Sequence, residues 1–409
     1  MSDPGATPAL TDLLTSLGGR EGRSTLVDTA IASAREHLGM DLSLLSEFRD
    51  GRQVYRRFSG PAESFGVERD GGPPLEATYC HRVVSGALDP VVPDSARHPV
   101  VAELPITREA GIGAYVGVPV HLPDGQLYGT LCCLSHAPDP SLRDRDARFL
   151  EVLATILGEE IGRDQERIER HRTLAERVRS VLGNGSLSSV FQPIVALRDG
   201  RLAGLEALVR VDAAAYRSPE PLFADAREVG LGAEVELAAV AQALAHLDRL
   251  PADVYLSVNL SPATVASPLL GAVLDGVDAR RVLIEVTEHA VADEYEVLRS
   301  AMGGLRELGS QFAIDDVGAG YAGLNHLLQL APDVIKLDRF LIRGIAEDPA
   351  RQAIAAAAAA FAAHARTRVI AEGVETAADH ERLLELGIRY GQGFHYGRAG
   401  TLEQALATG

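Results

Sequence analysis

The sequence predicts an α/β protein whose C-terminal half is a (β/α)8 barrel with one antiparallel strand, preceded by a smaller α+β domain. The 409 residues are too many for one ordinary hydrophobic core. From Ser189 onward, strand and helix patterns alternate through eight strands over about 220 residues, which is the size of such a barrel. The first two of these strands are joined by Arg198-Asp199-Gly200, which is too short for a helix, so this pair must be antiparallel.

Composition excludes several classes of protein. With 46% hydrophobic and 23% charged residues the chain is expected to fold, and its net charge of −18 argues against binding a nucleic-acid polymer. A small anion held through metal ions is not excluded, because a bound cation reverses the local charge. The three cysteines, Cys80, Cys132 and Cys133, match neither a disulfide framework nor a zinc site, and we expect packed thiols.

The beginning of the chain favours a cytoplasmic protein. Residues 1–21 are small and polar, and we expect a flexible tail there. The opening sequence, MSDPGATPALTD, lacks the basic and apolar regions of a signal peptide. No apolar stretch reaches the length of a membrane span.

Residues 22–140 predict the smaller domain. Apolar spacing predicts an opening helix, alternation predicts two strands, and a hairpin turns at Pro123-Asp124-Gly125. In chain order the predicted elements are the helix Ser24–Leu38 and the strands Asp41–Phe48, Gln53–Phe58, Tyr115–Leu122 and Gln126–Leu134.

Residues 141–183 predict one long connecting helix that ends at a Gly-Asn-Gly sequence. Its apolar positions alternate in steps of four and three, which indicates a heptad seam with two polar members. The seam consists of Leu157, Ile161, Asp164, Ile168, His171, Ala175, Val178 and Leu182. Because the middle is strongly charged, we expect the helix to pair with a second copy as a coiled coil; a solvated connector is the alternative.

Residues 184–409 predict the barrel. The predicted strands are Val190–Val195, Leu202–Val211, Val254–Asn259, Val282–Thr287, Phe312–Asp316, Val334–Leu337, Val369–Glu372 and Arg389–Gln392. The predicted helices are Phe223–Leu250, Glu294–Leu308, Pro349–His364 and Ala377–Leu386.

Acidic residues gather at the strand ends, where barrels of this type place catalytic groups. They are Glu206, Glu285, Glu288, Asp315, Asp316, Asp338, Glu372 and Glu375, accompanied by Asn259 and Lys336. A single acid there is usually structural, but carboxylates from several strands could not all stay ionised without partners, and one lysine cannot neutralise them. Oxygen ligands without His or Cys suit Mg²⁺ or Mn²⁺, and paired ions can activate water against a phosphodiester.

These residues carry a family resemblance. The motif series begins with FQPIV, EALVR and SVNLSP, continues with EVTE, DDVGAGY and DVIKLD, and ends with AEGVE and GQGF. It resembles the EAL domain family over the last 220 or so residues and implies a TIM-type barrel. The resemblance implies hydrolysis of cyclic di-GMP to linear 5′-pGpG.

The resemblance also implies roles for individual residues. Ligands of two divalent cations are implied for Glu206, Asn259, Glu285, Asp315, Asp316 and Glu372. Catalytic roles are implied for Glu372 at the attacking water, Lys336 as its positioner, and Glu288 as the anchor of the 315–323 loop, which resembles the family's dimerising loop. Substrate contacts are assigned to Gln192, Leu208, Arg210, Asp338, Glu375 and Gln392. Departures from the pattern, such as Val211 and Val317, lie outside the ligand set.

Two other functions remain open at this point. A degenerate family member would bind cyclic di-GMP and act as a receptor or scaffold through protein partners, yet none of the metal ligands is missing here. A different phosphodiester or a metal-dependent lyase is the third possibility, because a fold alone does not fix a substrate.

The N-terminal pattern resembles a GAF domain, a small-molecule sensor module with an antiparallel sheet. This resemblance implies that an unknown small molecule or protein regulates the barrel, and the seam and family loop imply a homodimer. The Cys80-His81 pair raises the idea of a bilin, but it lies in EATYCHRVVSG, an ordinary helix opening. We expect neither bilin nor haem.

Overall fold

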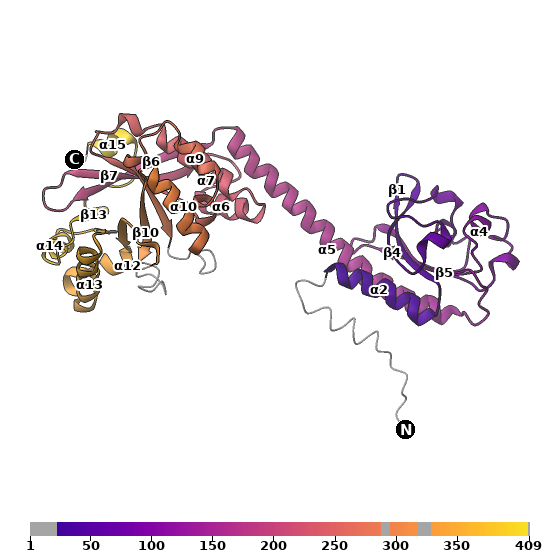
Figure 1. Cartoon of the computed structure of the whole chain (residues 1–409). Coiled ribbons are helices and arrows are strands. Elements are labelled where there is room, and N and C mark those ends of the chain that lie inside the picture. The colour runs from indigo at the N-terminus through magenta and orange to yellow at the C-terminus, as the bar shows by residue number, and fades with distance from the viewer. Residues whose placement is uncertain (1–22, 288–294, 318–328, 408–409) are drawn as a thin grey trace, which may run out of the picture. The chain divides into compact units, whose positions relative to one another are not determined.

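The computed structural model describes residues 23–287, 295–317 and 329–407 (Figure 1). The chain divides into two compact units, Met1–Glu169 and Arg170–Gly409, with the boundary inside one helix. The predicted tail lies outside the described residues.

The first unit is built on a five-stranded antiparallel sheet in the order β2-β1-β5-β4-β3. The predicted helix and four predicted strands are confirmed, while the short β3 was not predicted. The elements are α2 (Arg23–Leu38), β1 (Leu42–Arg49), β2 (Arg52–Ser59), α3 (Tyr79–Val84), β3 (Val91–Val92), α4 (Pro105–Glu109), β4 (Ala114–His121) and β5 (Leu127–Ser135).

Two apolar clusters cover the two faces of this sheet. Helix α2 and the start of the next helix, α5 (Asp144–Gly183), pack on one face through residues such as Ile31 and Leu157. Helix α3 and the segments around it cover the other face, where Tyr79, Cys80 and Cys132 are buried together. Side chains alternate between faces along a strand, so the neighbouring Cys133 belongs to the first cluster.

Helix α5 confirms the predicted long helix, and its seam is covered at both ends by the chain itself. Leu157 packs in the core of the first unit, and Val178 is fully buried in a cluster of the second unit. Between them Ile168 is 63% exposed and His171 is exposed. The surface left for a second copy is therefore the middle of the seam, and pairing there stays a prediction.

The second unit contains a closed barrel of eight strands in the order β10-β11-β12-β13-β6-β7-β8-β9. Strand β6 is antiparallel to both of its neighbours, β7 and β13, whereas all the other pairs are parallel, so the predicted single reversed strand is confirmed. The strands are β6 (Leu187–Ala196), β7 (Leu202–Val211), β8 (Tyr255–Asn259), β9 (Val282–Thr287), β10 (Gln311–Val317), β11 (Val334–Leu337), β12 (Arg368–Ala371) and β13 (Tyr390–Gln392).

The helices around the barrel include one correction. The predicted helix Phe223–Leu250 is two helices, because Gly230 takes a left-handed φ of 73° just after α6 ends, a common helix stop for glycine. The helices are α6 (Pro219–Glu228), α7 (Gly232–Leu244), α8 (Pro262–Val265), α9 (Leu269–Leu274), α10 (Tyr295–Glu307), α12 (Arg339–Ile342), α13 (Pro349–Ala365), α14 (Ala377–Glu385) and α15 (Leu402–Leu406). Among the described residues, no helix is both long and apolar enough to cross a membrane.

Candidate functional site

A single lysine side chain organises the acidic residues inside the barrel. Lys336 lies on β11 and is 1% exposed. Its Nζ is 2.6 Å from a carboxylate oxygen of Glu285 and 2.6 Å from one of Glu372. Oxygens of Asp315 and Glu206 follow at 3.4 and 3.6 Å. Carboxylates from four strands and strand ends therefore converge on one ammonium group, a contact that the sequence analysis did not predict.

Lys336 is also the only lysine in the chain. The chain has 39 basic residues, and all the others are arginines. A planar guanidinium presents five donors in a rigid fork, whereas an ammonium is a compact charge that can contact oxygens from several directions. The contacts to four separate carboxylates require the second geometry, which gives a physical reason for a lysine here.

Neutral side chains hold the two most buried carboxylates in place. Glu206 on β7 accepts hydrogen bonds from the amide nitrogens of Asn259 at 2.8 Å and Gln392 at 2.5 Å. Glu285 on β9 is fully buried and accepts a hydrogen bond from the hydroxyl of Ser257. Asn259 uses its nitrogen in this contact, so its oxygen is the atom left for a cation. Sequence reasoning missed Ser257, although it precedes Asn259 by two residues on β8.

Burial and mutual repulsion separate the pKa values of these acids. Burial raises the pKa of Glu285 well above its usual range, and the carboxylates of Glu206 and Asp315 add to the effect. Burial and Asp315 likewise raise the pKa of Glu372 to about 8. For Glu206, burial is outweighed by Lys336, Gln392 and Asn259, which together lower its pKa. Without cations the site therefore retains protons at some carboxyl groups, which a bound cation would displace.

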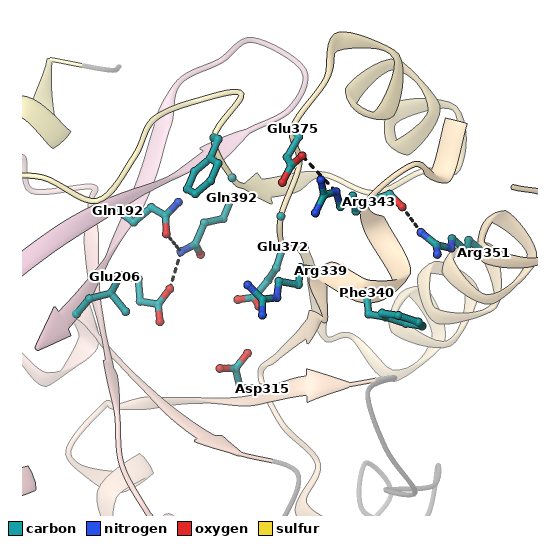
Figure 2. A pocket seen from close by; sticks show the side chains of 14 residues that line it. Gln192, Glu206, Asp315, Arg339, Phe340, Arg343, Arg351, Glu372, Glu375 and Gln392 are labelled. Carbon is teal, nitrogen blue, oxygen red and sulfur yellow. Dashed lines mark hydrogen bonds and ion pairs between the residues drawn. The ribbon is translucent and has the colours of Figure 1, made fainter. Parts of the chain in front are cut away.

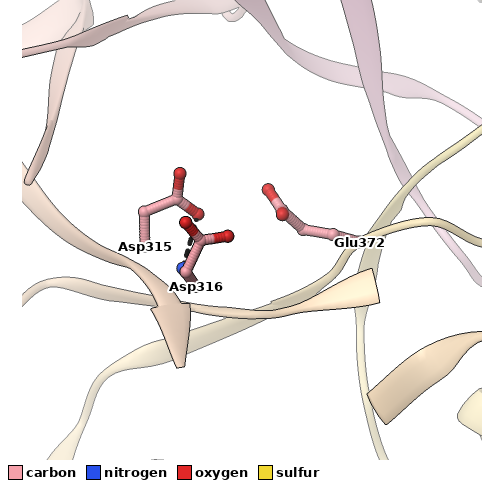
Figure 3. Close-up of side chains that lie close together, drawn as sticks. All are labelled: Asp315, Asp316 and Glu372. Carbon is pink, nitrogen blue, oxygen red and sulfur yellow. Dashed lines mark hydrogen bonds between the residues drawn. The ribbon is translucent and has the colours of Figure 1, made fainter. Parts of the chain in front are cut away.

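Three of the acids form a candidate cation site, shown in Figure 3. One oxygen each of Asp315, Asp316 and Glu372 lies within 4.8 Å of the others. Oxygen ligands of Mg²⁺ or Ca²⁺ lie about 2.0–2.6 Å from the ion, so oxygens on opposite sides are about 4–5 Å apart. The spacing and the oxygen-only donor set fit a hard divalent cation. Burial and the neighbouring Asp315 also raise the pKa of Asp316 to about 6, as expected of crowded carboxylates that lack a cation.

The backbone at this pair is unusual. Asp316 has a left-handed φ of 58°, a conformation that a non-glycine residue rarely adopts. Its amide nitrogen donates to the Asp315 carboxylate at 2.9 Å. The turn lets two consecutive aspartates direct their carboxylates toward Glu372, although consecutive side chains of a regular strand point to opposite faces.

Two cavities meet at these acids. The larger one, of about 620 Å³, lies between the strand ends and the segment after β11 (Figure 2). The second, of about 530 Å³, extends toward α6 and α7. Glu206, Leu208 and Asp315 line both cavities, so a ligand in either one would lie beside the carboxylates.

Most of the residues predicted to contact substrate line these cavities. Gln192, Leu208, Glu375 and Gln392 line the larger cavity, and Arg210 lines the second. Asp338 lines neither of these two cavities. Its carboxylate instead caps α12 by accepting a hydrogen bond from the backbone amide of Phe340 at 2.7 Å. Glu288 and the part of the 315–323 loop after Val317 lie outside the described residues.

Sequence reasoning missed a group of cationic and aromatic residues on the larger cavity, most of them in the DRFLIRG segment after β11. The group consists of Arg339, Phe340, Arg343, Arg351 and Phe394. Phe340 is 70% exposed and Phe394 is 54% exposed, and each ring carries a guanidinium on one face, from Arg351 and Arg398 respectively. The two arginines of that segment, Arg339 and Arg343, were the available signal.

Comparison with known families agrees with this geometry. Residues 175–399 match the model of the EAL domain family. The chain belongs to the EAL domain family. Residues 22–161 match the model of the GAF domain family, and this range includes the start of α5 that packs on the sheet of the first unit.

Several curated relatives of the EAL domain are named as phosphodiesterases. "Cyclic di-GMP phosphodiesterase PdeR" of Escherichia coli K12 is 31% identical over 250 residues, covering 57% of this chain and 37% of the relative. "Bifunctional diguanylate cyclase/cyclic di-GMP phosphodiesterase MucR" of Pseudomonas aeruginosa is 28% identical over 313 residues, covering 74% of this chain and 45% of the relative. The chain therefore spans less than half of each of these two relatives.

Solved structures show the same barrel. The structure titled "PaMucR Phosphodiesterase, c-di-GMP complex" matches with a TM-score of 0.51 and 30% identity, covering 57% of this chain and 99% of the other. A structure of the EAL enzyme Bd1971 matches with a TM-score of 0.54 over 90% of this chain and 92% of the other. Its identity of 19% supports a shared fold alone.

Proposed function

We propose that this protein hydrolyses cyclic di-GMP to linear 5′-pGpG with two divalent cations bound at the carboxyl ends of the barrel strands. The observation that carries the proposal is the complete acidic set around Lys336, with three carboxylate oxygens at cation-binding distance. The relatives named as cyclic di-GMP phosphodiesterases support the choice of substrate.

The residues divide into cation ligands and substrate contacts. We assign Glu206, Asn259, Glu285, Asp315, Asp316 and Glu372 to the two cations, which when bound would polarise a phosphate and activate a water. Lys336 holds Glu285 and Glu372 in position through its two shortest contacts. We also assign Glu372 to the attacking water, because its carboxylate lies both at the candidate cation site and 2.6 Å from the Lys336 ammonium.

The larger cavity supports a dinucleotide as the ligand. Arg339, Arg343 and Arg351 supply positive charge for phosphates, and exposed aromatic rings offer flat surfaces for bases. The side-chain oxygen of Gln392 is buried and lacks a hydrogen-bond partner among the described residues, so it could accept a donor from a ligand. Gln192 and Arg210 extend the substrate contacts into the two cavities.

The order of domains along the chain suggests how the barrel is regulated. We propose that residues 22–140 sense an input, that residues 141–183 connect, and that residues 184–409 catalyse. The exposed middle of the α5 seam is the proposed contact between two copies in a homodimer. If removing the residues before Ser141 leaves the rate and its cation dependence unchanged, the regulatory part is wrong.

The test is product analysis with cyclic di-GMP in Mg²⁺ and in Mn²⁺. Wild type should release pGpG, and Glu206→Ala should release none because it loses a ligand and leaves Lys336 with one carboxylate fewer. Glu403→Gln is the matched control, since Glu403 pairs with Arg249 on the surface. Full activity in Glu206→Ala would refute the ligand assignment. Tight binding of cyclic di-GMP by wild type without any pGpG would instead indicate a receptor.

A further inference from the structure

The core of the first unit contains two cysteines from distant parts of the chain in direct contact. Cys80 on α3 and Cys132 on β5 are 52 positions apart, and their sulfur atoms are 3.8 Å apart. Both are reduced and buried, with 3% and 2% of their surface exposed. Strand β5 is the central strand of the five, so the contact joins the sheet's middle to the helix that covers it.

Polar groups also contact the Cys80 sulfur. The amide nitrogen of Gln53 donates toward its sulfur at 3.2 Å, and the hydroxyl of Tyr115 lies 3.5 Å from it. Gln53 also donates to Ser46 at 3.0 Å, and the Ser46 hydroxyl lies 2.9 Å from that of Thr130. Donors that point at a sulfur stabilise its thiolate more than its thiol.

The two thiols therefore differ in acidity. The hydrogen bond with Cys132 is the largest of the effects that lower the pKa of Cys80 to about 7, against the opposing effect of burial. The same contact, together with burial, raises the pKa of Cys132 well above its usual range. One cysteine is thus poised to react as a thiolate, and the other keeps its proton beside it, which is the arrangement of an attacking and a resolving thiol.

We propose that Cys80 and Cys132 form a redox-sensitive dithiol that a small peroxide converts reversibly to an intramolecular disulfide. The burial of both thiols restricts the oxidant to molecules of about the size of hydrogen peroxide that enter during local opening of the fold. This site is independent of the phosphodiesterase chemistry proposed for the barrel.

The reaction takes place in two balanced steps. The Cys80 thiolate attacks one peroxide oxygen, the O–O bond breaks, and the departing hydroxide takes up a proton to become water. The Cys132 sulfur then attacks the Cys80 sulfenic acid: the S–S bond forms, the S–O bond breaks, and the leaving hydroxide takes the Cys132 proton as a second water. Two thiols lose two electrons and one peroxide gains them.

The two sulfur atoms already lie close together, so disulfide formation needs only a small movement. The sulfur atoms must approach from 3.8 Å to about 2.05 Å, a change that side-chain rotation and a small shift of the six-residue α3 can supply. The bond would tie α3 to β5 across 52 positions of chain. Cys133 cannot replace Cys132, because it points to the opposite face of the sheet among the side chains of α2 and α5.

The test treats the folded full-length chain with peroxide, and then counts thiols and maps peptides after unfolding, because all three thiols are buried in the fold. After a modest excess of hydrogen peroxide, the three free thiols should fall to one, and a non-reduced digest should link the peptides of Cys80 and Cys132. Dithiothreitol should restore all three. In Cys133→Ser, the matched control on the same strand, two thiols should fall to none with the same linkage.

The variants Cys80→Ser and Cys132→Ser should form no intramolecular disulfide under these conditions. If either fails to fold, wild type and Cys133→Ser decide the question alone. Three remaining thiols after peroxide treatment, a linkage that includes Cys133, or oxidation that dithiothreitol does not reverse would each overturn the proposal.

Discussion

Replacing Lys336 with methionine tests the electrostatic core of the barrel directly. Methionine keeps most of the length of the side chain but removes the only cation found within 4 Å of Glu206, Glu285 and Glu372 in the described structure. Removing one partner of a buried charge cluster costs about 3–5 kcal/mol, because the remaining charges lose their compensation. For a unit of this size each kcal/mol lowers the melting temperature by about 2–4 °C, so we expect a fall of about 6–20 °C.

The measurement is calorimetry of the full chain at pH 8 after removal of divalent cations, following the transition of the barrel. The loss should be smaller at pH 5, where protonation of Glu372 removes much of the uncompensated charge. Mg²⁺ or Mn²⁺ should recover part of it, since cations would replace the missing ammonium. The control is Arg201→Met, which breaks the exposed pair with Asp253 and should change stability by no more than about 0.5 kcal/mol. If Lys336→Met melts within about 2 °C of wild type at pH 8, the ammonium does not compensate the carboxylates and our reasoning is wrong.

Three further predictions follow from the same site. In cation-free protein the pKa of Asp316 is raised to about 6 and that of Glu372 to about 8, so the folded state holds protons that the unfolded state releases. The free energy of unfolding should therefore fall as pH rises from 5 to 9, as measured by urea unfolding at a series of pH values. A flat or rising curve would show that the carboxyls are not crowded. In protein labelled with isotopic lysine the side-chain NMR spectrum should contain one lysine signal. Burial opposes the charge of Lys336, but the surrounding carboxylates outweigh it and raise the pKa well above its usual value, so the signal should stay that of a charged amine through pH 10.5. Mg²⁺ should shift this signal, and titration of the amine below pH 10.5 would contradict the contacts. The variant Ser257→Ala removes the hydroxyl that donates to the buried Glu285 and should destabilise the barrel by about 1.5–3 kcal/mol in urea unfolding, whereas an unchanged midpoint would show that this hydrogen bond contributes little.

Strands were easier to predict than the helices between them. Each barrel strand is a short apolar run between turn residues, so its position depends on local sequence, and the observed strands begin and end within three residues of the predicted ones. The break between α6 and α7 depends on one glycine, Gly230, in a left-handed conformation, and the apolar periodicity continues across it. Short helices such as α8 and α12 span only four residues, too few to show a helical period.

The residues predicted as cation ligands lie close together in the structure, but the arrangement of charge among them did not follow from the sequence. Glu206 on β7 and Glu285 on β9 are both buried glutamates, yet the pKa of Glu206 is lowered and the pKa of Glu285 is raised. The difference arises from Gln392 and Asn259, which donate to Glu206 from strands that are distant in the chain. Asp338 belongs to the same acidic series, and only its contact with Phe340 identifies it as a helix cap.

The sequence by itself determined the order of the strands and helices, the reversed first strand of the barrel, and the residue types able to bind divalent cations. These features follow from turn length, apolar spacing and donor chemistry, which are local properties of the chain. Only the tertiary structure decided which carboxylates share Lys336, which cavities they line, and that Cys80 meets Cys132 rather than Cys133. These contacts join residues far apart in the chain, and they form only when the barrel closes and a helix packs against a sheet. The distance between two such side chains, and the burial of each, therefore cannot be read from the residue type at a single position.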